Sequence, residues 1–169
     1  MPTKIVISSS NSRWINIALA FLLLGLLLFI IGFSTSHWVV YGQQHTGLWE
    51  KFFCTRQVCY EVSAVSRHNA DWFKACQALE ILGLIALLLA FIILFLYMFV
   101  ETCRGRNALL AIMICTFAGV AFIIIGVIIF NTKKGSSLYE IGWSMGLAIA
   151  GAVFAFIAGV MVVLGYLGK

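Results

Sequence analysis

The sequence is poor both in residues that break helices and in residues that carry charge. Its 169 residues include a single proline, Pro2, so no helix beyond that point need be kinked by proline. Charged residues make up 10% of the chain, against about 25% in soluble domains. A chain of this length with so few charges cannot cover a surface that faces water. The composition therefore excludes a soluble globular protein and makes a lipid bilayer the expected surroundings.

We also recognise no sequence motif that is typical of a catalytic or cofactor-binding site. We recognise no glycine loop that would cradle phosphate, no pair of metal ligands on a helix and no nucleophile elbow. We therefore expect neither an enzyme nor a bound cofactor or metal. The net charge of +5 is small and is shared between both ends of the expected spans, which does not indicate nucleic acid binding.

What the chain does contain is four long apolar runs, which extend over about 14–36, 76–100, 107–130 and 141–167. Each exceeds the roughly 18 apolar residues that indicate a transmembrane helix. The first run is too long for the apolar part of a cleaved signal peptide, which is its alternative interpretation. The connections at 101–106 and 131–140 are short, so consecutive helices should be antiparallel. We expect an all-α membrane protein in which residues 1–169 form one tetraspan domain, an up-down-up-down bundle of four transmembrane helices.

Both chain ends should lie on one side of the membrane, because four spans return the chain to the side where it began. The positive-inside rule does not choose that side, since five basic residues fall with the termini and six on the other side. Cys54 and Cys59 are more informative, because they lie in the longest polar loop and paired cysteines persist in oxidising compartments. We expect this loop outside the cell, both termini in the cytoplasm and the protein in the plasma membrane.

The loop at 37–75 has the pattern of a small antiparallel sheet. β-branched and aromatic residues gather at 38–41, 48–54 and 58–62, and Gly, Gln and Thr lie between them. A sheet this small buries little apolar area, so we expect a disulfide between Cys54 and Cys59 to stabilise it. Zinc bound with His45 or His68 is the alternative, but those spacings match no standard zinc site.

Other single residues have weaker interpretations. Cys103 lies beside a basic residue at the expected cytoplasmic end and is a candidate for palmitoylation, whereas Cys76 and Cys115 are expected to be small packing residues. Glu80 is the only charge in the second span. We expect its carboxylate to reach the headgroup region or a hydrogen-bond partner on a neighbouring helix.

Small residues recur along the spans, most regularly in the fourth. They permit close helix packing in lipid, either within one bundle or between molecules, and the sequence does not separate these two uses. The packing or oligomer candidates are Gly142, Gly146, Gly151, Ala155 and Gly159.

The loop also carries a recognisable signature: Trp38, then Gly47-Leu48-Trp49, then Cys54 and Cys59. This pattern resembles the signature of the claudin superfamily, which includes claudins, the peripheral myelin protein and the epithelial membrane proteins. The segments at 71–78 and 139–144 look like the starts of the second and fourth spans in the peripheral myelin group. Four residues separate Trp49 from Cys54, where claudins usually have two, so the subgroup stays open.

The resemblance implies roles for these residues. Trp38, Leu48 and Trp49 would anchor the sheet at the outer leaflet, Gly47 would permit a close turn, and the cysteines would form the bridge. Mere interfacial anchoring is the alternative for the tryptophans.

The implied function is a structural and interaction protein, which contacts itself or other membrane proteins in the same membrane or on an apposed cell, including at cell junctions. A regulatory subunit of an ion channel or receptor is the alternative. A channel or transporter in its own right is less expected, because no polar stripe follows the spans.

Overall fold

The computed structural model describes residues 3–55, 58–65, 70–134 and 140–168. Four helices in these residues are long and apolar enough to cross a membrane. They are α1 (Thr3–Ser34), α2 (Asp71–Phe99), α3 (Arg106–Lys134) and α4 (Trp143–Leu167), and the short 3₁₀ helix η1 (Glu101–Cys103) joins α2 to α3. The uninterrupted apolar runs produce these helices because backbone groups in lipid must bond within their own segment.

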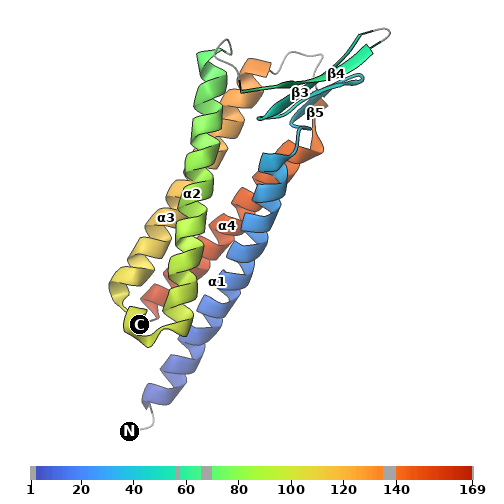
Figure 1. The fold of residues 1–169 in the computed structure, drawn as a ribbon. Coiled ribbons are helices and arrows are strands. Elements are labelled where there is room, and N and C mark those ends of the chain that lie inside the picture. Colours follow the sequence, from blue (N-terminus) through green and yellow to red (C-terminus); the bar gives the residue numbers. More distant parts are fainter. Residues whose placement is uncertain (1–2, 56–57, 66–69, 135–139, 169) are drawn as a thin grey trace.

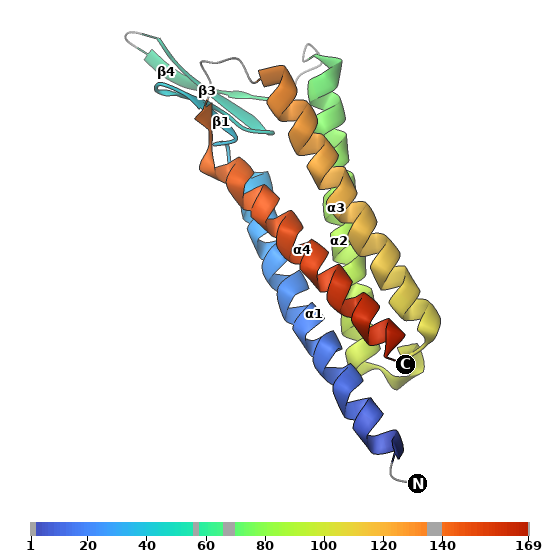
Figure 2. The same cartoon turned by 180° about the vertical axis from the view of Figure 1, so that it is seen from behind.

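The helices form two closely packed antiparallel pairs, α1 with α4 and α2 with α3 (Figures 1 and 2). The α1–α4 contact depends on glycine, since a Cβ at Gly25 would lie 2.8 Å from the carbonyl oxygen of Gly151. Gly83 and Gly119 likewise permit close packing of α2 against α3, since a Cβ on either would crowd the carbonyl oxygen of the other. Both ends of the chain lie at one end of the bundle, and a β-sheet covers the other (Figure 1).

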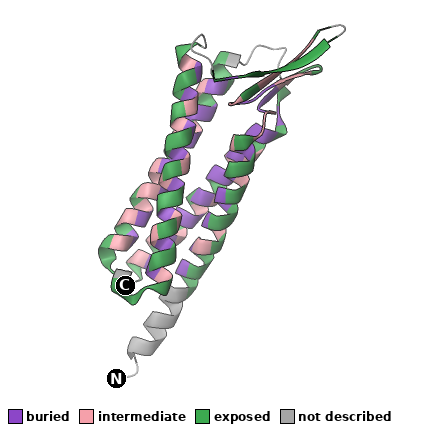
Figure 3. Cartoon of the chain, in the orientation of Figure 1, coloured by how far each residue is buried: buried purple, intermediate pink, exposed green. Residues whose placement is uncertain are grey.

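Burial follows the helix period rather than a division between apolar and polar residues. The buried positions run along the inner sides of the helices, and the outer sides remain exposed (Figure 3). Many exposed side chains are large and apolar: Ile114 is 68% exposed, and Ile92 and Ile128 are each more than half exposed. Such an outer surface fits hydrocarbon rather than water.

The sheet has five strands in the order β4-β3-β2-β1-β5, and all neighbouring strands are antiparallel. Four strands come from the connection between α1 and α2: β1 (Val39–Tyr41), β2 (Gln44–Thr46), β3 (Glu50–Thr55) and β4 (Val58–Ser63). The fifth, β5 (Glu140–Ile141), immediately precedes α4 and pairs with β1. The β3–β4 hairpin projects beyond the helices (Figures 1 and 2).

The expected boundaries need correction. α1 begins at Thr3 rather than near residue 14, and α2 begins at Asp71 rather than near Cys76, because helices continue past the apolar runs that signal them. α3 likewise extends to Lys134. Residues 140–141 belong to β5 and not to the fourth span. The strands β2 and β5 were not expected, since β2 (Gln-His-Thr) is polar and β5 has only two residues.

Candidate functional site

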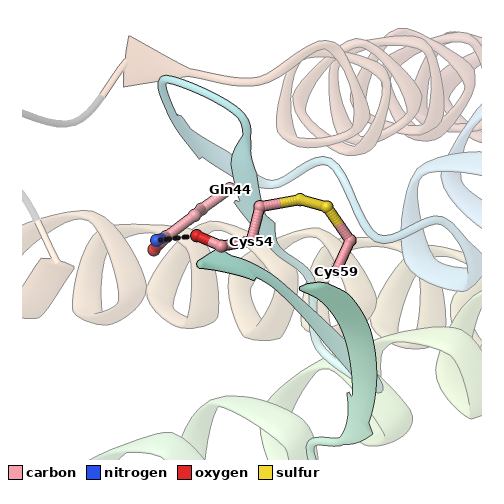
Figure 4. The surroundings of a disulfide bond; sticks show 3 residues. All are labelled: Gln44, Cys54 and Cys59. Atoms are coloured by element: carbon pink, nitrogen blue, oxygen red, sulfur yellow. Dashed lines mark hydrogen bonds between the residues drawn. A yellow bond between two sulfur atoms is a disulfide. The ribbon is translucent and has the colours of Figure 1, made fainter. Parts of the chain in front are cut away.

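A disulfide closes the β3–β4 hairpin. Cys54 and Cys59 are directly opposite each other on the two strands, with Cα atoms 4.1 Å apart, and their sulfur atoms are bonded (Figure 4). The side-chain nitrogen Nε2 of Gln44 donates to the carbonyl oxygen of Cys54 at 3.3 Å and so ties β2 to the same point. Every residue of β4 is exposed, and this strand is an edge of the sheet, paired on one side only. The bridge therefore fixes a strand that few packing contacts hold.

Trp38 attaches the sheet to α1 rather than to lipid. Its side chain is 0% exposed, its indole nitrogen donates to the carbonyl oxygen of Gly32 at 2.8 Å, and its ring lies 5.2 Å from that of Phe130. Leu48 is equally buried, and its carbonyl oxygen accepts a hydrogen bond from the Gln77 side chain at 2.7 Å. The expected anchoring at the outer leaflet is thus replaced, for both residues, by contacts inside the protein.

Trp49 makes a similar contact one residue further along α1. Its indole nitrogen donates to the carbonyl oxygen of Phe33 at 2.9 Å, and the two rings meet edge to face with centroids 5.1 Å apart. Gly47 lies against the end of α1, where a Cβ would collide with the backbone of Ser36. Glycine is needed here for close approach of two backbone segments.

The start of α4 is bound to the connection between α1 and β1. The amide nitrogen of Gly142 donates to the carbonyl oxygen of Trp38 at 2.9 Å, and that of Ser144 donates to the carbonyl oxygen of His37 at 3.1 Å. The amide of His37 donates in turn to the Ser144 hydroxyl at 3.1 Å. A Cβ at Gly142 would collide with the carbonyl of His37, so this glycine serves the attachment.

The other small residues of α4 divide between two surroundings. Gly151 and Ala155 lie in the α1–α4 contact, and a Cβ on Gly159 would meet the Phe117 ring of α3 at 3.0 Å. Gly146 is exposed, and no described heavy atom would lie within 4 Å of a Cβ there. Among these, Gly146 is the position with room for a neighbouring molecule.

The two faces of the sheet differ in charge. Opposed residues of antiparallel strands share a face, so the pairs His45–Phe52 and Phe52–Glu61 place these three side chains together. By the same alternation Glu50 and Glu140 lie on that face, which therefore carries all three glutamates of the strands. The opposite face carries Lys51, whose ammonium lies 4.8 Å from the centre of the Phe73 ring. Burial and the neighbouring His37 lower the pKa of His45 below its ordinary value of 6.5, and Glu61 acts in the opposite sense.

Glu80 does not lie where we expected. Its side chain is 0% exposed inside the bundle, and neither carboxyl oxygen has a hydrogen-bond partner among the described residues. Its Oε1 is so close to α3 that a Cβ at Gly126 would collide with it. The carboxyl thus reaches neither the headgroup region nor a described partner. Cys76 is a buried free thiol one turn away, Cys115 is half-buried and free, and the side chain of Cys103 lies outside the described residues.

One motif escaped the interpretation of the sequence. Residues 142–146 read Gly-Trp-Ser-Met-Gly, which matches the G-x-S-x-G pattern of a nucleophile elbow, and they follow a strand and open a helix. The geometry is not that of a nucleophile. Ser144 is 0% exposed, and its hydroxyl oxygen is hydrogen-bonded to the Thr35 hydroxyl at 2.8 Å and to the His37 amide. The His37 ring is stacked on other rings rather than placed as a base.

The sequence matches one known protein family over most of its length. A sequence model of the PMP-22/EMP/MP20/Claudin family matches residues 13–162, which include the first three spans, most of the fourth and the whole sheet. The chain belongs to this family. The resemblance and the claudin-like fold predicted from the sequence are both confirmed. No curated protein matches the sequence.

Membership in the PMP-22/EMP/MP20/Claudin family, together with four apolar helices, makes the chain a multi-pass membrane protein embedded in the bilayer. The family signature has a structural meaning in this chain. Trp38, Leu48 and Trp49 fix the sheet to α1 and α2, and Cys54 and Cys59 close its outermost hairpin. The signature residues thus describe how a small sheet is mounted on a helix bundle.

Proposed function

We propose that this claudin-family protein is a structural and interaction protein of the plasma membrane, without enzymatic activity, whose sheet contacts neighbouring molecules at cell–cell contacts. The observation that carries the proposal is the exposed strand β4, held by the Cys54–Cys59 disulfide on a sheet attached to both helix pairs. An exposed sheet edge with its own backbone donors and acceptors is a surface suited to binding another protein.

The proposed orientation places the sheet outside the cell and both termini in the cytoplasm, so that the chain acts as one tetraspan unit. A disulfide persists in the oxidising exterior, which supports this choice. Antibody binding to epitope tags at the two termini, measured on intact and on permeabilised cells, tests this orientation. We expect binding only after permeabilisation. Antibody binding to either tag before permeabilisation would contradict it.

Enrichment at borders between expressing cells tests the role of the sheet. We expect the wild-type protein to gather where two expressing cells meet, and the double variant Val58→Ser with Tyr60→Ser to gather less, because both side chains are exposed on β4. Val65→Ser is the matched control, since Val65 is 67% exposed in the same segment but lies beyond the strand. Equal enrichment of the double variant and the control would reject β4 as the contact.

At a junction we propose a barrier rather than a charge-selective path. The long loop as a whole mixes both signs of charge, although its two strand glutamates, Glu50 and Glu61, share one face of the sheet with Glu140 of β5. Transepithelial resistance and dilution potentials across a cell layer distinguish the two functions. Higher resistance without ion preference supports the barrier, whereas cation selectivity that Glu61→Gln abolishes would replace it with a cation path.

An auxiliary subunit of an ion channel or receptor is the second candidate, and Gly146 is the observation that favours it. This exposed glycine on α4 lies one turn from Trp143, which is 53% exposed, and leaves space for close approach of a partner helix. Purification in mild detergent tests this role. A stoichiometric channel or receptor that is lost in Gly146→Leu, but retained in Val153→Leu on the same helix, supports it; self-association alone supports the first proposal.

A further inference from the structure

Four rings stack in a row where the sheet meets α4. The imidazoles of His37 and His45 are 4.0 Å apart between centroids, with planes at 12°. His37 also stacks with Trp143 at 5.5 Å, and His45 stacks with Phe52 at 4.7 Å. The rings come from the connection after α1, from β2, from β3 and from the start of α4. The row therefore joins segments that are far apart in the sequence.

The same place carries the backbone attachment of the sheet. His37 exchanges two hydrogen bonds with Ser144, through its amide and through its carbonyl oxygen. Trp38, the next residue, accepts from Gly142 on one side and donates to the carbonyl oxygen of Thr46 on the other. A force that separates the two imidazoles would thus act on the bonds that hold β1, β2 and α4 together.

We propose that the His37–His45 stack is a proton-operated latch, which holds the sheet against the start of α4 while the rings are neutral and loosens it when both are charged. Neutral rings attract each other when they stack. One charged ring is still attracted to the faces of its aromatic neighbours. Two cations with centroids 4.0 Å apart repel each other, so the second proton is the one that opposes the stack.

The charged groups around the stack determine the direction of the effect. Glu61 on β4, Glu50 on β3 and Glu140 on β5 share the face of His45, and only the first acts on it appreciably. Lys51 lies on the opposite face against Phe73, and the α4 residues in contact, Trp143 and Ser144, are uncharged. Glu61 therefore opposes the lowering of the His45 pKa, but burial and His37 together outweigh it.

The pH range follows from linkage. Burial and the adjacent His37 lower the pKa of His45 in the folded protein, whereas the unfolded chain keeps the ordinary value of 6.5. As the pH falls past 6.5 the unfolded chain binds more protons than the folded one. The contribution of the stack is therefore complete above this pH and is lost below it, in the range of acidified compartments.

Histidine titrations by NMR, on the full chain in nanodiscs, test the stack. We expect His37→Gln to raise the pKa of His45, because a cation is removed from its neighbour, and Glu61→Gln to lower it, because an anion is removed. Each variant replaces one titratable side chain with the uncharged amide of glutamine, and the two variants carry opposite expectations. A His45 pKa that is the same in the wild type and in both variants would overturn the proposal.

Quenching of tryptophan fluorescence by acrylamide, a neutral quencher, tests the release. Trp38 is fully buried beside the latch, so quenching should increase when the pH is lowered from about 7.5 to about 5.5, the range in which histidine sensors act. His45→Phe keeps a ring that stacks but takes no proton, and its quenching should match the neutral wild type at both pH values. An acid-induced increase in His45→Phe equal to that of the wild type would overturn the latch, as would its absence in the wild type.

Discussion

The contact between α1 and α4 should not accept a methyl group at Gly151. A Cβ there would lie 2.7 Å from the carbonyl oxygen of Gly25 and 2.7 Å from the amide nitrogen of Phe29. Both are backbone atoms of a helix, so α1 would have to move as a unit. Overpacking costs about 1–3 kcal/mol, and contact with two backbone atoms belongs in the upper part of that range. Removing a glycine from a helix returns up to about 1 kcal/mol. We expect Gly151→Ala to lower the free energy of unfolding by about 1–2 kcal/mol.

Gly146→Ala is the matched control, because it makes the same chemical change on the same helix at a position with open space. Its stability should stay unchanged or rise by up to about 1 kcal/mol. Reversible unfolding by SDS in mixed micelles, followed by circular dichroism, measures both variants. If Gly151→Ala proves as stable as Gly146→Ala, α1 and α4 do not approach as closely as the structure describes.

Three further substitutions test the sheet and the bundle. Cys54→Ser should remove about 2 kcal/mol from the stability of the hairpin, because the bridge closes a short loop, and limited proteolysis should cut it faster than in Cys115→Ser. Trp38→Phe should cost about 1 kcal/mol for the lost hydrogen bond, against about 3–5 kcal/mol for Trp38→Ala, both measured by unfolding in SDS; a Trp38→Phe variant as stable as the wild type would deny the indole hydrogen bond its role. Glu80→Met should raise the free energy of unfolding by about 1–3 kcal/mol, because it removes a buried carboxyl without a described partner, and a loss of stability would reveal a partner.

The helices were predictable because each follows from a long apolar run, and their ends were not. Asp71 and Lys74 interrupt the apolar signal at the start of α2, yet the backbone is helical through both, and they form a salt bridge at 3.8 Å across one turn. The strand β5 was missed for a different reason. Its two residues are a strand only because β1 lies beside them, and no pattern within two residues reports a partner in another loop.

For the site, the sequence identified residues more successfully than contacts. Trp38 and Trp49 were predicted as functional residues, but their contacts were not. An amphipathic indole ring suits the membrane interface as well as a hydrogen bond to a helix carbonyl, so the side chain alone does not distinguish the two. The sequence marked Gly142 as a helix-packing residue, whereas its neighbour is the carbonyl of His37. Nothing in the sequence paired His37 with His45, because eight positions of separation in a loop give no sign that two rings will stack.

The pairing of β1 with β5 has a consequence for the order of biosynthesis. The first four strands leave the ribosome well before residues 140–141, and until then one side of β1 has no strand to bond. Docking of the last transmembrane segment delivers both the missing strand and the glycine-lined surface that packs on α1. A nascent chain stalled before this step would expose the unpaired backbone groups of one side of β1. An unfinished molecule therefore differs from a finished one by an open sheet edge, at which another chain can pair.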